Sequence, residues 1–275
     1  MRVRPAAVAG RFYPDQPDEL RSLIEDYLAS ARSARSVRSA QGGERVEQMV
    51  RPRAVIVPHA GLVYSGPIAA SAYVRLEPWA DEIERVLLVG PAHRVPLDGL
   101  ALSTADAFAT PLGLMPVDRA ACAAALEIAG VIAHDGAHRD EHSLEVQVPF
   151  LQLVVPHAAL LPVLVGRGAA AETVCDLMAR FLDEPGWVAV VSSDLSHFRP
   201  AENCRALDAE TSRAIERLAD AELNGQRACG YLGIQGLLQV ARERSWQAAT
   251  VDLRNSGDTA GGRESVVGYG AYVVC

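Results

Sequence analysis

The sequence contains no lysine, since all 26 basic residues among its 275 residues are arginine. Schiff-base chemistry, pyridoxal-phosphate anchoring and the Walker phosphate loop each depend on a lysine amine, so these classes are excluded. Long apolar runs are also missing. The segment Leu160–Gly166 is among the longest, and it falls far short of the roughly 20 residues of a membrane span. No basic start precedes an apolar segment, so we expect a cytoplasmic protein without membrane contact.

Cysteine is scarce, and its spacing forms no Cys-x-x-Cys pair. An odd number of widely spaced cysteines argues against a disulfide framework or a structural zinc knuckle. The net charge of −8 argues against general nucleic-acid binding, which needs a basic surface. The five cysteines are Cys122, Cys175, Cys204, Cys229 and Cys275.

Short apolar runs alternate with helical patterns over most of the chain. Such alternation predicts an α/β fold with a mostly parallel central sheet and helices on both faces. We expect a single domain over residues 1–275, with a hairpin at Ala109–Val117. The four central strands are predicted at Arg53–Pro58, Arg85–Gly90, Leu160–Val165 and Trp187–Val191, and two further strands at Ala248–Arg254 and Ser265–Val274. Helices are predicted at Gly66–Leu76, Asp118–Ile128, Glu141–Leu153, Ala170–Leu182, Ala201–Glu222 and Gly230–Ala241.

The segment Ser30–Arg53 differs from the rest in composition. It is rich in Ser, Arg, Gln and Gly and carries six Arg against two Glu. This composition is typical of a solvated surface insertion.

Three predicted strands each deliver a histidine within a few residues of their carboxyl end. The first runs into His59, the second into His93 and the fourth into His197. Ligands of open α/β sheets bind beyond the carboxyl ends of the strands, and imidazole is the commonest protein ligand for transition metals. If these strands are neighbours, the sequence predicts a metal-binding pocket at this edge.

A second cluster suggests a different chemistry. His138-x-x-Glu141-His142 has the spacing of an inverted zinc-peptidase motif, which needs both histidines on one helix face. We expect Asp140 to cap the helix that follows it, which would leave His138 outside that helix. The metallopeptidase is therefore a weaker alternative, and we interpret Glu141 and Glu145 as helix-dipole partners or pocket-wall groups.

An ordered series of motifs resembles the Memo family, which includes protein B of the AmmeMemoRadiSam system. The resemblance runs nearly from end to end, apart from the segment Ser30–Arg53. The motifs are Arg4-Pro5-Ala6, the run 8–14 (VAGRFYP), the run 58–66 (PHAGLVYSG), Gly90-Pro91-Ala92-His93, Thr110-Pro111-Leu112-Gly113, the run 141–151 (EHSLEVQVPFL), the run 192–197 (SSDLSH), Cys229-Gly230, Asn255-Ser256-Gly257-Asp258 and the run 266–269 (VVGY).

The resemblance implies a fold similar to that of the class III extradiol, LigB-type dioxygenases and assigns roles to residues. It makes His59, His93 and Cys229 the metal ligands. It makes His197 the acid/base histidine, accompanied by Asp194 in the shell or beside that ring. Such dioxygenases bind Fe(II) through two histidines and a carboxylate, whereas a thiolate shifts the preference towards copper or zinc. The pocket and supporting residues are Tyr64, Glu141, His142 and Glu145.

The leading hypothesis is one metal ion, Fe(II) before copper or zinc, in an oxidoreductase-like protein that acts on a small molecule. An alternative from another class is a module that binds a peptide or small ligand in the same pocket without turnover. The resemblance to protein B further implies a partner in a radical-SAM pathway. The sequence names no substrate.

Overall fold

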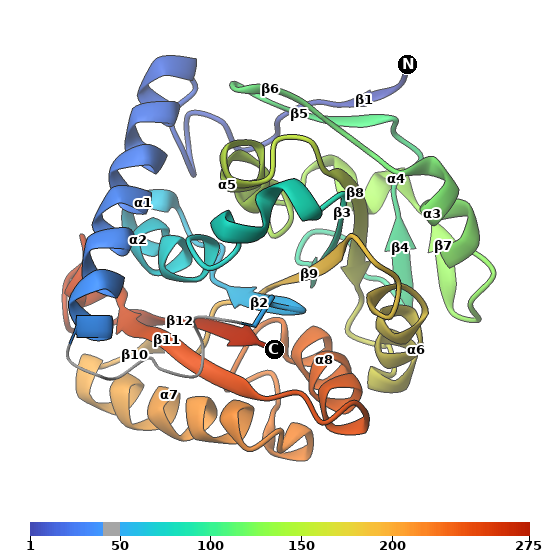
Figure 1. Cartoon of the computed structure of the whole chain (residues 1–275). Coiled ribbons are helices and arrows are strands. Elements are labelled where there is room, and N and C mark those ends of the chain that lie inside the picture. The colour runs from blue at the N-terminus through green and yellow to red at the C-terminus, as the bar shows by residue number, and fades with distance from the viewer. Residues whose placement is uncertain (41–49) are drawn as a thin grey trace.

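The computed structural model describes residues 1–40 and 50–275 (Figure 1). Within these residues the main sheet has nine strands, in the order β10-β12-β2-β9-β3-β8-β4-β7, with β11 paired to β12. The strands are β2 (Ala54–Val57), β3 (Arg85–Pro91), β4 (Leu100–Leu102), β7 (Val131–Ala133), β8 (Ala159–Val165), β9 (Trp187–Ser192), β10 (His197–Arg199), β11 (Ala248–Asn255) and β12 (Val266–Val274).

The centre of this sheet is parallel. Strands β2, β9, β3 and β8 pair in parallel register, and their side chains are almost all buried. An uninterrupted apolar strand needs cover on both faces, which explains the runs of Val, Ile and Leu. Antiparallel pairs join β12 to β2 and β4 to β8. The predicted α/β fold with a mostly parallel sheet is confirmed.

Helices cover both faces of the sheet. In Figure 1, α1, α2 and α5 lie on one side, and α6, α7 and α8 lie on the other. No helix in the described part of the chain is long and apolar enough to cross a membrane. The helices are α1 (Pro17–Ala40), α2 (Leu62–Tyr73), α3 (Arg119–Ala125), α4 (Asp135–Arg139), α5 (Val148–Val154), α6 (Ala171–Leu182), α7 (Ala201–Glu216) and α8 (Tyr231–Glu243), with short 3-10 turns at Glu77–Glu82, Glu145–Gln147, Asp220–Glu222 and Ser256–Asp258.

A small second sheet joins the start of the chain to the middle. Its order is β1-β5-β6, where β5 (Ala107–Thr110) and β6 (Gly113–Pro116) form the hairpin that was predicted at Ala109–Val117. Strand β1 (Val3–Arg4) pairs in parallel with β5. The N-terminal segment is therefore fixed against residues more than a hundred positions away.

Several predicted elements have different bounds in the structure. Residues 30–40 of the Ser30–Arg53 segment extend α1, and residues 41–49 lie outside the described residues. The helix expected at Ala201–Glu222 ends at Glu216, close to Leu218, whose backbone has a φ of 55°. A left-handed residue cannot continue a right-handed helix.

The helix predicted at Glu141–Leu153 begins later than expected. Pro149 lies in the first turn of α5 and helps to start that helix, because a missing N–H costs nothing at this position. The prediction that Asp140 caps this helix is wrong. His134 caps the preceding helix α4, and Asp140 is the residue at which α4 ends.

Candidate metal centre

Two of the predicted histidines meet because their strands flank a third. Strand β9 lies between β2 and β3, so the loops that follow β2 and β3 emerge on either side of Ser192, the last residue of β9. His59 comes two residues after β2, and His93 comes two residues after β3. The carboxyl ends of these parallel strands share one edge of the sheet. The two imidazoles are 5.2 Å apart between ring centroids.

A third histidine completes the cluster. His142 lies between α4 and α5, and its ring stacks on His93 at 4.8 Å and meets His59 edge-on at 5.4 Å. Each of the three histidines offers a ring nitrogen, and these nitrogens lie within 4.8 Å of one another. Ligand atoms about 2 Å from a common centre have separations of this order or smaller. The geometry therefore fits one metal ion.

The hydrogen bonds of Ser192 fix the tautomer of His59. The Ser192 hydroxyl donates its only proton to the backbone carbonyl of Ser143, 2.6 Å away, and accepts from the side-chain amide of Gln147 at 2.9 Å. Its contact of 2.9 Å with His59 Nδ1 must then be accepted from an Nδ1–H. Nε2 of His59 then carries the lone pair, as a metal ligand requires, and its neighbour is the Cys229 sulfur at 3.3 Å.

Glu141 orients the other two imidazoles. Its Oε1 lies 3.0 Å from His93 Nδ1 and 3.2 Å from His142 Nδ1, and the side chain is 2% exposed. The same carboxylate accepts the backbone N–H groups of His93, Arg94, His142 and Ser143. A carboxylate that accepts from Nδ1 leaves Nε2 available, which is the usual arrangement behind metal-bound histidines.

The charge states suit a cation. Burial, reinforced by the neighbouring His93 and His142, lowers the pKa of His59 to about 3, although Asp194 opposes the shift. His59 is thus neutral near pH 7 and can act as a ligand. Burial alone would raise the pKa of Glu141, but hydrogen bonds from His142 and His93 bring that pKa well below its usual range. His59 is thus a neutral donor, and the negative charge of Glu141 lies behind His93 and His142.

Cys229 lies beside the cluster. Its Sγ is 3.3 Å from His59 Nε2 and partly buried. Burial, with a contribution from the charge of Asp194, raises the pKa of this thiol to about 12. The predicted trio of His59, His93 and Cys229 is therefore brought together in space, with His142 added and the sulfur in its protonated form.

Asp194 contacts the backbone of the loop that carries His59. Its Oδ1 accepts the backbone N–H groups of His59 at 2.7 Å and of Ala60 at 3.3 Å. Its own N–H points to the sulfur of Cys229 at 3.3 Å. Asp194 thus holds the loop that carries His59. Among the described residues, no hydrogen bond joins Asp194 to the ring of His197.

His197 lies at the rim, on β10. Its Nδ1 donates to the carbonyl of Leu195 at 2.8 Å, so Nε2 is free to accept a proton. It lines a surface recess together with His93 and Cys229. The position is compatible with a proton carrier for a molecule bound beside the cluster.

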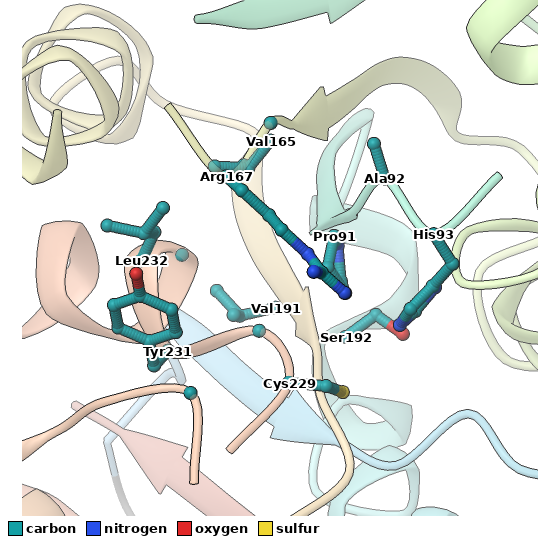
Figure 2. Close-up of a pocket in the computed structure, with 15 residues that line it drawn as sticks. Pro91, Ala92, His93, Val165, Arg167, Val191, Ser192, Cys229, Tyr231 and Leu232 are labelled. Carbon is teal, nitrogen blue, oxygen red and sulfur yellow. The ribbon is translucent and has the colours of Figure 1, made fainter. Parts of the chain in front are cut away.

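A cavity of about 330 Å³ opens next to the histidines (Figure 2). His93, Ser192 and Cys229 form one side, and Tyr231 and Leu232, at the start of α8, form the opposite wall. A volume of this size admits a small molecule.

The remaining predicted residues lie elsewhere. Tyr64 is 38% exposed in the first turn of α2 and is not among the residues that line the cavity. Glu145 is buried against Arg4 and Tyr13, away from the histidines. His138 donates from Nε2 to the carbonyl of Ala101. Helix α4 ends at Arg139, so the one-helix geometry of the peptidase alternative is absent.

Three residues of the centre were not assigned their roles from the sequence, although each lies in a motif that was singled out there. His142 was predicted only as a supporting residue. It follows no predicted strand, and the helix start predicted at Asp140 was wrong. Ser192 and Gln147 set the tautomer of His59 from two distant segments. Only the folded arrangement joins these positions.

Comparisons with known proteins agree with this fold. A family model described as "Memo-like protein" matches residues 4–273. A "MEMO1 family protein" of Aquifex aeolicus is 34% identical, with 98% of each chain covered, and one of Aeropyrum pernix is 34% identical, with 100% of each covered. Among solved structures, the uncharacterized protein JW3007 of Escherichia coli K12 has a TM-score of 0.50 at 13% identity, over 80% of this chain and 99% of that one.

Proposed function

Because this chain belongs to the Memo-like protein family, we propose that it holds one metal ion between His59, His93 and His142 and uses it in redox chemistry on a small molecule. The observation that carries the proposal is the set of three imidazole nitrogens within 4.8 Å of one another. The hydrogen bonds of Ser192 and Glu141 support it, since they engage Nδ1 of His59 and His93 and leave Nε2 as the possible ligand atom.

Three imidazoles suit iron, copper and zinc, and we rank Fe(II) first because of the resemblance to extradiol dioxygenases. Such an ion would supply Lewis acidity and one-electron chemistry to a molecule in the cavity. The proposed set of three histidines includes no carboxylate ligand, because Glu141 contacts the Nδ1 atoms of His93 and His142 instead. The donor set therefore differs from that of the ring-cleaving enzymes, and we do not propose ring cleavage.

The chain's own residues would supply the rest of the chemistry. His197, with Nε2 free at the rim, would exchange a proton with the bound molecule. Asp194 would keep the His59 loop in place. The start of α8 would keep bulk water from one side of the cavity.

Metal analysis of protein purified without oxygen tests the proposal. We expect one bound ion in the wild type and its loss in His93→Ala. His157→Ala is the matched control, because His157 is exposed and lies outside the cluster. Equal, near-zero metal in the wild type and in His93→Ala would contradict the proposal.

Two further variants separate the two ligand sets. We expect His142→Ala to lose the ion and Cys229→Ser to retain it, because Cys229 lies outside the three-histidine set. The reverse pattern would assign the third ligand to Cys229, as the family resemblance implies.

A further inference from the structure

The cavity beside the histidines contains a cation without a described partner. Arg167 follows β8 by two residues and lines the cavity together with His93 and Cys229. Figure 2 shows its side chain extended across the cavity, towards the side where Pro91, His93 and Ser192 lie. No described residue gives the guanidinium a hydrogen bond or an ion pair. Asp98 lines an adjoining recess with it, and no ion pair joins the two.

Several described arginines have no partner for the guanidinium, and Arg167 is the one of them that lines this cavity. The chain carries a net charge of −8, and many of its surface arginines pair with carboxylates, as Arg180 does with Glu184 and Arg244 with Asp183. A guanidinium is a planar fork that matches a carboxylate or phosphate. Arg167 is exposed, and its guanidinium extends across the cavity without a described partner, so it can pair with an anionic group of a molecule bound there.

The opposite wall is compatible with such an anion. Tyr231 and Leu232 begin α8, whose first turn carries no acidic residue. The positive end of the helix dipole therefore faces the cavity without a neutralising carboxylate. The side chains of Tyr231 and Leu232 add an apolar surface. The wall would thus accept the organic body of a ligand and would not repel its charge.

We propose that the site takes a small organic anion, whose carboxylate or phosphate pairs with Arg167 and whose body lies along Tyr231 and Leu232. The volume of about 330 Å³ limits it to a small molecule. The anionic end of the ligand then lies on the side of the cavity where His93 lies, and its body points away from that histidine. This inference rests on the proposed metal centre, for which it names the class of substrate.

Binding of matched probes tests the inference. Phenylacetate and phenyl phosphate carry the anion, and phenylacetamide is the neutral counterpart of the first. We expect saturable binding of at least one anion to the wild type and a loss of at least about tenfold in Arg167→Gln, because a charge-assisted hydrogen bond is removed. Phenylacetamide should bind more weakly than phenylacetate and should not respond to the substitution. Arg213→Gln is the control, since Arg213 is an exposed arginine on α7, outside the cavity.

Three results would overturn the inference: no saturable binding of either anion, unchanged affinity in Arg167→Gln, or equal binding of the acid and the amide. Metal content is measured in the same preparations, so that the two proposals can fail separately. If the wild type binds no metal but its anion affinity still depends on Arg167, only the proposed metal centre is contradicted. If the protein binds metal but its anion affinity is unchanged by Arg167→Gln, only the proposed anion site is contradicted.

Discussion

Two buried glutamates, four residues apart, hold different parts of this molecule. Glu145 is 1% exposed and accepts from Arg4, from the Tyr13 hydroxyl and from the backbone N–H groups of Ala7 and Val8. Glu141 is 2% exposed, accepts from His93 Nδ1 and lies 3.2 Å from His142 Nδ1. The other donor atoms of Arg4 go to the backbone carbonyls of His138 and Glu141, whereas each imidazole that contacts Glu141 has a second nitrogen available to the cluster. The two buried carboxylates therefore differ in role because their donors differ: Glu145 holds a buried arginine, and Glu141 holds candidate metal ligands.

The largest effect that we expect concerns stability at Glu145. Glu145→Gln leaves the Arg4 guanidinium buried without its counter-charge, which costs about 3–5 kcal/mol of unfolding free energy. Urea unfolding of metal-free protein measures this. Glu184→Gln is the control, because the Arg180–Glu184 pair is half exposed and should change stability by no more than about 1 kcal/mol. A loss at Glu145 as small as that of the control would break the comparison.

The second effect concerns metal affinity at Glu141. Glu141→Gln replaces the charged acceptor of His93 and His142, and such a change behind a metal ligand lowers affinity about 10–100-fold. Competition with a chelator measures this for Glu141→Gln and for folded Glu145→Gln side by side. We expect the latter to keep the wild-type affinity. An equal loss of metal affinity in both variants would show that the two carboxylates do not have the separate roles described.

A smaller effect is expected from pH at His138, whose backbone carbonyl accepts from Arg4 and which belongs to the structural side of the comparison. Burial lowers the pKa of His138 from its ordinary value of 6.5 to about 4. The unfolded chain then binds the proton first, so the stability contribution is complete above 6.5 and is lost as pH falls towards 4.

His138→Gln tests this, because glutamine keeps a donor for the carbonyl of Ala101 and does not titrate. Between about pH 7 and about pH 5, the wild type should lose roughly 2 kcal/mol more unfolding free energy than the variant does. Urea unfolding at the two pH values gives the difference. Parallel losses in the two proteins would show that His138 does not titrate as its burial implies.

The fold and half of the centre could be predicted from local patterns. Apolar runs predicted β2, β3, β8 and β9, and the rule for strand ends then directed His59 and His93 to one edge. His142 could not be found in this way, because its position depends on where α4 ends and on a carboxylate that also holds His93. The assignment of Glu145 to the pocket failed for a related reason: its partner Arg4 is 141 residues away, and no local pattern joins the two.

The location of the ion is the central claim, and anomalous diffraction measures it directly. Crystals of protein prepared without oxygen and with Fe(II) would be measured on both sides of the iron absorption edge. The account predicts one peak, about 2.0–2.2 Å from a ring nitrogen of each of His59, His93 and His142. The absence of a peak at this position, or a peak bound by other residues, would contradict it.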